Sequence, residues 1–138
     1  MAIENPSRDE IKDILQRSKR IAVVGLSDSP DRSSYGVSKA MQEAGYEIIP
    51  VNPNVDEVLG VKAVDSLEDI EDHIDIVDVF RRSEFLPDLA KQTVAIGADV
   101  FWAQLGVSNQ EAYDYLKEHG ITVVMDRCIK VEHSLTRV

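Results

Sequence analysis

The stretch that decides the fold is IAVVGLSDSPDRSSYG, residues 21–36. A short apolar run ends at Gly25, and a polar loop then leads into a helix expected over 35–44. A buried strand, a glycine turn and a helix N-terminus form the first unit of a nucleotide-binding α/β domain. Ser27 and Pro30 stand where a dinucleotide-binding fingerprint has its second and third glycines. The turn therefore raises the question of which ligand it holds.

The rest of the chain alternates between strand and helix patterns. Apolar runs predict strands over 21–25, 47–51, 61–64, 75–80, 100–103 and 121–125. Capping signals and helical spacing predict helices over 7–19, 35–44, 66–69 and 83–96, and a further one that begins at a capping box over 108–111. Strands separated by helices favour a Rossmann-like, doubly wound parallel sheet of five to six strands.

Length and composition predict one domain. The chain has 138 residues and contains neither an internal repeat nor a linker rich in Pro, Gly or Ser. We divide it into an N-terminal helix over 7–19, a Rossmann-like core over 20–126 and a C-terminal tail over 127–138.

The negative net charge of the chain argues against polyanionic partners. The formal net charge is −10, from 25 acidic and 15 basic side chains, which argues against nucleic acid or an anionic membrane as the main partner. The chain has no apolar run near the roughly 20 residues that span a bilayer. Its charged N-terminus lacks the apolar core of a signal peptide, so we expect a cytoplasmic protein.

Ligands of such a sheet lie across the carboxyl ends of the strands. After the first strand, Gly25 permits a tight turn, and amides, hydroxyls and cations that could meet phosphate follow it. Asp28 and Asp31 must then point away, and an ordinary loop whose serines cap a helix remains an alternative. The candidate phosphate ligands are Gly25, Ser27, Arg32, Ser33, Ser34 and Lys39.

The end of the second strand argues against NAD. An NAD site needs an acidic residue there to accept hydrogen bonds from the ribose hydroxyls. This chain has Val51, Asn52 and Pro53 instead, although Asn-Pro is also an ordinary turn.

Catalytic motifs are few. His73, His119 and His133 show no metal-ligand spacing in the sequence and are interpreted as structural or exposed, so we expect no metal site. No Gly-x-Ser-x-Gly motif occurs, and no carboxylate pair is placed for acid–base chemistry. We expect Phe101 and Trp102 to lie in the core.

Cys128, the only cysteine, excludes an internal disulfide and is the one ambiguous nucleophile. It follows the last strand at the ligand edge, and Arg127 and Lys130 could favour its thiolate. A half-buried, inert cysteine that closes the last strand is the alternative.

Several blocks in order carry a resemblance over about Ser7 to His133. They read VVGLSDSPDRSSYGVSKAMQEAGYEIIPVNP, EVLGVKAVDSLEDI, DIVDVFRRSEFLPDLA, FWAQLGVSNQEAYDYLKEHG and VVMDRCIKVEH. The chain resembles the small single-domain CoA-binding proteins, which are similar to the CoA-binding domain of the succinyl-CoA synthetase alpha subunit. The resemblance implies a Rossmann-like fold that binds coenzyme A. The synthetase's phosphorylated histidine belongs to a second domain, so its ligase chemistry does not carry over.

The resemblance also implies where coenzyme A lies. Phosphates would meet Gly25, Ser27, Arg32, Ser33 and Tyr35, the adenosine would meet Val51, Asn52 and Pro53, and the pantetheine would border Phe80, Arg81, Gln104 and Gly106. A non-catalytic CoA or acyl-CoA binding protein, with a protein partner or as a homo-oligomer, is the leading hypothesis. The alternatives are an NAD(P)-binding redox protein and the CoA-binding subunit of a two-chain acyl-CoA ligase.

Overall fold

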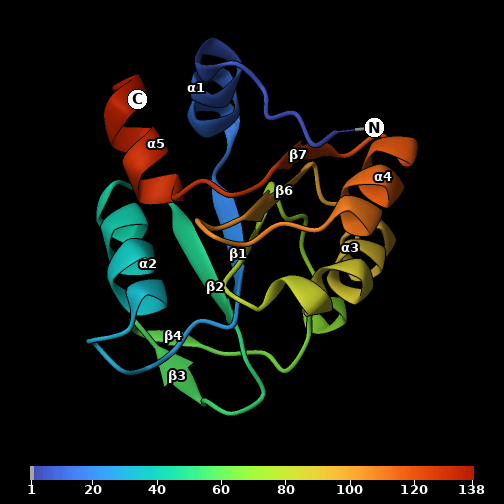
Figure 1. Cartoon of the computed structure of the whole chain (residues 1–138). Helices are drawn as coiled ribbons and strands as arrows, with labels where there is room; N and C mark the ends of the chain where they lie inside the picture. Colours follow the sequence, from blue (N-terminus) through green and yellow to red (C-terminus); the bar gives the residue numbers. More distant parts are fainter. Residues whose placement is uncertain (1) are drawn as a thin grey trace.

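The computed structural model describes residues 2–138 as a five-stranded parallel sheet covered by helices on both faces (Figure 1). The strand order is β2-β1-β5-β6-β7. The strands are β1 (Arg20–Val24), β2 (Glu47–Val51), β5 (Ile76–Val79), β6 (Val100–Ala103) and β7 (Thr122–Val124). The helices are α1 (Arg8–Arg17), α2 (Ser33–Glu43), α3 (Leu86–Ala95), α4 (Gln110–Glu118) and α5 (Ile129–Thr136).

This architecture confirms the expected Rossmann-like fold. One core layer lies between the sheet and α3 with α4, and the other lies between the sheet and α1, α2 and α5. Phe101 and Trp102 are fully buried on opposite faces of β6, because successive residues of a strand point to opposite sides of the sheet.

The segment expected as a sixth strand belongs to a separate hairpin. β3 (Glu57–Val58) and β4 (Val61–Lys62) pair antiparallel, and Leu59 and Gly60 between them both adopt positive φ. Two central residues with positive φ are typical of the tight turns that join hairpin strands. The predicted 61–64 strand is therefore wrong as a member of the main sheet, although Val64 forms an isolated bridge with Val51.

Helix boundaries follow local capping with small corrections. The Ser7 hydroxyl accepts from the Glu10 amide, and the Glu10 carboxylate accepts from the Ser7 amide, as the capping box predicts. Asn109, not Ser108, caps α4, because its side-chain oxygen accepts from the Ala112 amide. The expected 83–96 helix begins with a 3-10 turn, η2 (Ser83–Phe85), and the expected 66–69 helix is the 3-10 turn η1 (Leu67–Asp69).

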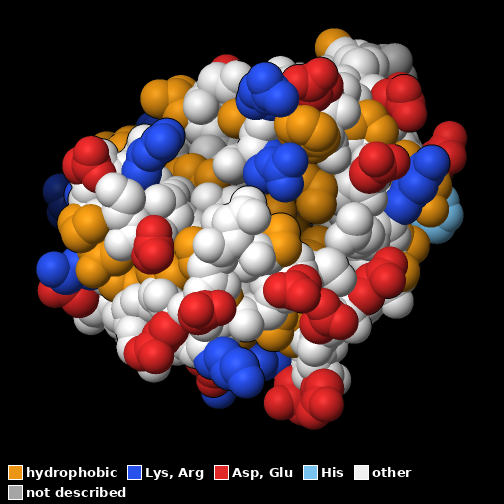
Figure 2. All heavy atoms as spheres, turned by 90° about the horizontal axis from the view of Figure 1, so that it is seen from below, with side chains coloured by type: hydrophobic (Ala, Val, Ile, Leu, Met, Phe, Trp, Pro, Cys, Tyr) orange, Lys and Arg blue, Asp and Glu red, His pale blue; other side chains and the backbone are white. Residues whose placement is uncertain are grey.

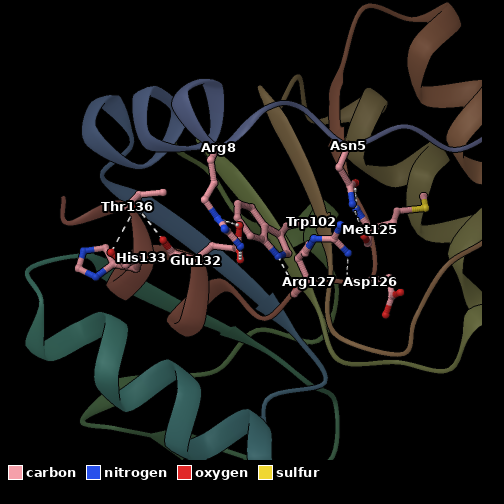
Figure 3. Close-up of polar contacts among 9 residues, drawn as sticks. All are labelled: Asn5, Arg8, Trp102, Met125, Asp126, Arg127, Glu132, His133 and Thr136. Atoms are coloured by element: carbon pink, nitrogen blue, oxygen red, sulfur yellow. Dashed lines mark hydrogen bonds and ion pairs between the residues drawn. The ribbon is translucent and has the colours of Figure 1, made fainter.

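The segment 127–138, expected as a C-terminal tail, contains the helix α5, which packs against α1 and α2. Glu132 lies on the buried face of α5, and Arg8 of α1 pairs with both of its carboxylate oxygens at 3.3–3.4 Å (Figure 3). A buried carboxylate left without a partner would be costly, so this pair ties the two helices together.

The chain before α1 crosses the edge strand of the sheet. The Asn5 side-chain amide donates to the Met125 carbonyl at 2.8 Å, and its oxygen accepts from the Met125 amide at 2.8 Å (Figure 3). One side chain thus satisfies both backbone groups of Met125, the residue that directly follows the edge strand β7.

Candidate functional site at the carboxyl edge of the sheet

The chain reverses its direction of winding between β1 and β5, and three strand ends meet there. The Gly25 amide donates to the Val51 carbonyl at 2.9 Å, and a Cβ built on Gly25 would lie 2.6 Å from the Phe80 carbonyl oxygen. Gly25 has φ +84°, a conformation that favours glycine. In the strand order β2-β1-β5-β6-β7, the expected ligand position is the crevice at the carboxyl ends of β1 and β5.

A cavity of about 720 Å³ opens at this edge. Figure 2 views the molecule from below Figure 1, and therefore faces this edge of the sheet. Residues after β5 and β6 supply most of the wall, and the first residue of α2 and the N-cap of α5 complete it. The lining residues are Ser33, Phe80, Arg81, Arg82, Ser83, Gln104, Leu105, Gly106, Val107 and Cys128.

Six residues selected from the sequence line this cavity. They are Ser33, Phe80, Arg81, Gln104, Gly106 and Cys128. Arg82, Ser83, Leu105 and Val107 were not selected, although they follow the same two strands directly. The signal that could have found them is the rule that ligands meet the loops after the inner strands. Leu105 is 71% exposed, so it offers apolar surface at the rim of the cavity.

Two arginines give this edge a positive site in an acidic protein. The Arg81 and Arg82 guanidinium carbons lie 4.3 and 5.3 Å from the centre of the Phe85 ring. Stacking on an aromatic face holds a guanidinium in place. The Arg82 Nε atom also pairs with the Glu84 carboxylate at 3.2 Å, which offsets part of the positive charge of Arg82. Figure 2 shows basic groups beside hydrophobic surface toward the middle of this face, with acidic groups at several points around them.

The floor of the cavity contains a buried polar network. Asp78 on β5 is 1% exposed, and the Gln104 side-chain amide donates to its carboxyl group. The Gln104 oxygen accepts from the Ile129 amide at the start of α5, at 3.3 Å. Burial raises the pKa of Asp78 to about 7, although the Gln104 hydrogen bond opposes the shift. The network thus joins two strands to α5 directly beneath the cavity.

The first turn is ordered by its own hydroxyls and does not line this cavity, apart from Ser33. The buried Ser34 hydroxyl accepts from the Ser27 amide at 3.0 Å, and the Ser27 hydroxyl accepts from the Ser29 amide at 3.0 Å. Arg32, the N-cap residue of α2, is exposed. Of the other predicted residues, Tyr35 is half-buried against the α2 side of the core and Lys39 is exposed.

The second turn is fastened to the first by Asn52. Its side-chain amide donates to the Leu26 carbonyl at 3.1 Å, and its oxygen accepts from the Asn54 amide at 2.9 Å. Both ends of the side chain therefore have partners in the fold. Val51 is buried in the core and Pro53 is exposed beside it, and neither lines the cavity.

Cys128 is half-buried at the N-cap of α5 and lines the cavity. Arg127, the residue before it, is anchored to the core, because the Trp102 indole N–H donates to the Arg127 carbonyl at 2.8 Å (Figure 3). The Asp126 carboxylate accepts from the Gly106 amide at 2.7 Å, which links this loop to the opposite wall. The thiol is therefore held at the site and does not face the core alone.

Comparison with known protein families decides the family. The model of the CoA binding domain matches residues 19–134, which include every strand and all of the helices except α1 and the end of α5. The chain belongs to this CoA-binding domain family. The Bacillus subtilis protein YneT, described as uncharacterized, is 67% identical over 98% of this chain and 100% of its own length.

Other relatives are larger enzymes, and this chain matches only a part of each. An ADP-forming acetate–CoA ligase of Methanocaldococcus jannaschii is 27% identical over 82% of this chain, but the match covers only 17% of the ligase. The alpha subunit of a Pyrococcus furiosus ligase of the same type is 28% identical over 80% of this chain and 27% of its own length. The chain thus spans about a quarter or less of these two ligases.

Solved structures share the complete fold. A hypothetical protein from Pyrococcus horikoshii superimposes with a TM-score of 0.93 at 37% identity over 100% of both chains. A Thermus thermophilus protein gives a TM-score of 0.91 at 38% identity over 95% of this chain and 99% of its own. Among residues 2–138, no helix has the length and apolar character needed to cross a membrane.

Proposed function

We propose that this domain binds coenzyme A or an acyl-CoA at the carboxyl edge of the sheet, without catalysing a reaction on its own. The observation that carries the proposal is the cavity at the carboxyl ends of β5 and β6, next to the point between β1 and β5 where the strand order reverses. Its lining combines apolar side chains, two arginines and a thiol. Coenzyme A has the same three parts: a flexible pantetheine arm, phosphates and a terminal thiol.

The phosphates and the adenosine are assigned to the turns beside the cavity. The Tyr35 and Gly36 amides donate to the Arg32 carbonyl at 3.1 and 3.2 Å, so the Ser33 and Ser34 amides are the ones for which α2 offers no carbonyl. The helix dipole favours an anion there. Ser27, Ser33, Arg32 and Tyr35 lie on or next to this turn, with Lys39 further along α2. The adenosine is placed at the Val51 to Pro53 bend, which supplies a rigid wall.

Two alternatives differ from this proposal in chemistry. An NAD(P)-binding redox protein would use the same fold, but β2 is followed by an amide side chain with both ends engaged and not by a free carboxylate. A CoA-binding subunit of a two-chain acyl-CoA ligase would use the same site together with a partner chain. The similarity to parts of acetate–CoA ligases favours keeping this second alternative.

Calorimetric titration with coenzyme A, NAD and ATP side by side tests the proposal. We expect saturable binding of coenzyme A and much weaker binding of NAD. NAD binding as tight as that of coenzyme A would favour the redox alternative, and no binding of coenzyme A would overturn the proposal.

Arg32→Ala should weaken coenzyme A binding by about 1.5–3 kcal/mol, the range for a hydrogen bond to a charged group. The side chain is exposed and makes no capping hydrogen bond to α2, so the melting temperature without ligand should stay unchanged. Arg17→Ala, which removes an exposed arginine on α1, is the matched control. Equal dissociation constants for the wild type and the Arg32→Ala variant would show that Arg32 does not reach the phosphates.

Cys128 should form a mixed disulfide with coenzyme A. Its thiolate attacks one sulfur of CoA disulfide, the sulfur–sulfur bond of the reagent breaks, and one CoA thiolate leaves. Intact-mass spectrometry should detect one CoA adduct on the wild type and none on Cys128→Ser. Because the cavity would gather the reagent, CoA disulfide should react faster than glutathione disulfide. An unmodified wild type, or equal rates with both reagents, would contradict this prediction.

A further inference from the structure

A second cluster of ligand-type side chains lies at the opposite, amino edge of the sheet. His73 precedes β5 in a loop, Asp75 directly precedes β5, and Asp99 directly precedes β6. β5 and β6 are adjacent and parallel, and the Val100 amide donates to the Asp75 carbonyl at 3.0 Å. The pairing of the strands therefore places the two carboxylates side by side, although 24 positions separate them in the sequence.

The separations between the ligand atoms fit a metal ion. The His73 Nε2 atom lies 3.0 Å from Asp99 Oδ2 and 3.7 Å from Asp75 Oδ1, and all three atoms lie within 4.8 Å of one another. Ligand atoms bound tetrahedrally to Zn²⁺ at about 2.0–2.1 Å stand about 3.3 Å apart. Small side-chain rotations would therefore place the three atoms around one ion.

Asp75 is already oriented for this role. Its Oδ2 accepts from the backbone amides of Lys19 and Arg20, at 2.8 and 2.9 Å. Its Oδ1 is thereby directed toward the imidazole. Such outer hydrogen bonds hold a ligating carboxylate in place and are typical of metal sites.

The loop that carries the imidazole is also fixed. The Arg20 guanidinium donates to the His73 carbonyl at 2.7 Å, and the Glu47 carboxylate pairs with the same guanidinium at 2.8 Å. Glu47 thus offsets the charge that Arg20 brings near the cluster.

We propose that His73, Asp75 and Asp99 bind a divalent transition-metal ion of the Zn²⁺ class. One imidazole and two carboxylates suit Zn²⁺ better than Mg²⁺ or Ca²⁺, which prefer oxygen ligands alone. On binding, Nε2 of the imidazole gives up to solvent the proton that it would donate to Asp99 Oδ2, and the ion takes the place of that proton. The imidazole and one carboxylate are exposed, so a water molecule completes the coordination. The linear spacing of the histidines did not predict this cluster, because strand pairing creates it.

Calorimetric titration of the untagged protein with ZnCl₂ tests the proposal. It is performed on the wild type and on Cys128→Ser, so that binding by the thiol is recognised. We expect one saturable site in both proteins, weakened at least about tenfold by His73→Ala and by Asp99→Asn. His119→Ala removes an exposed histidine at the end of α4 and should bind as the wild type does.

Two further measurements complete the test. MgCl₂ should give no saturable binding, and ZnCl₂ should raise the melting temperature of the wild type but not that of His73→Ala. No saturable Zn²⁺ binding, or full retention of binding in His73→Ala or Asp99→Asn, would overturn the proposal. Coenzyme A binding should not change in His73→Ala, so failure here is distinguishable from failure of the proposed function.

Discussion

Replacing Gly25 with alanine should lower the free energy of unfolding by about 2–4 kcal/mol. The added Cβ would lie 2.6 Å from the Phe80 carbonyl oxygen, a backbone atom that cannot turn aside as a side chain can. The residue would also have to keep φ near +84°, where an L-residue is strained. Urea unfolding followed by circular dichroism measures this loss.

Gly36→Ala is the matched control for Gly25→Ala. Gly36 lies within α2, and a Cβ added there meets no atom within 4 Å. Since alanine favours a helix over glycine, this variant should gain about 0.5–1 kcal/mol. The Gly25→Ala variant should also lose coenzyme A binding, because β1 and β5 would be pushed apart at the site. A Gly25→Ala protein as stable as the wild type would contradict the close approach of these two strand ends.

Asp78→Asn should make the protein more stable than the wild type above pH 7. The folded-state pKa of Asp78 is raised to about 7, whereas an unfolded chain ionises this group near 4. Between these values the native state binds one more proton than the unfolded state. The contribution of Asp78 to stability is thus fully present below about pH 4, falls by about 1.4 kcal/mol per pH unit as pH rises, and levels above about pH 7.

An asparagine at position 78 keeps an oxygen acceptor for Gln104 but has no proton that titrates in this pH range. The stability of Asp78→Asn relative to the wild type should therefore rise steadily from pH 4 to 7. Urea unfolding of both proteins across this range measures the difference, so that the titration of other carboxylates cancels. Asp65→Asn, which changes an exposed carboxylate, should show no such trend. A difference that does not vary with pH would contradict the account of a protonated Asp78.

The sequence predicted those parts of the fold that local patterns determine. The strands over 47–51 and 100–103 have the predicted bounds, because each is an apolar run that stops at a turn. The α5 helix was not predicted. Its buried face contains Glu132 and Thr136 beside Ile129, so the apolar spacing of a helix is missing. The partner that makes Glu132 acceptable, Arg8, lies at the other end of the chain.

The residues at the candidate site could be predicted from the sequence only in part. Gly25, Phe80 and Gln104 could be selected because they follow strands at the ligand edge. Other features depend on how the turns pack, which the sequence pattern does not reveal. They are the hydrogen bonds of the Asn52 side chain with Leu26 and Asn54, and the hydrogen bond between Gln104 and Asp78. The cluster of His73 with two aspartates depends on strand order, which the sequence pattern leaves open.

Amide chemical-shift mapping of the labelled protein during a coenzyme A titration tests the central claim most directly. We predict that shifts concentrate at 25–35, 51–53, 80–83, 104–107 and Cys128, which lie around one edge of the sheet. The amides of Lys19, His73 and Asp99, at the opposite edge, should not move. Shifts concentrated at the opposite edge, or none at saturating ligand, would contradict the proposed site.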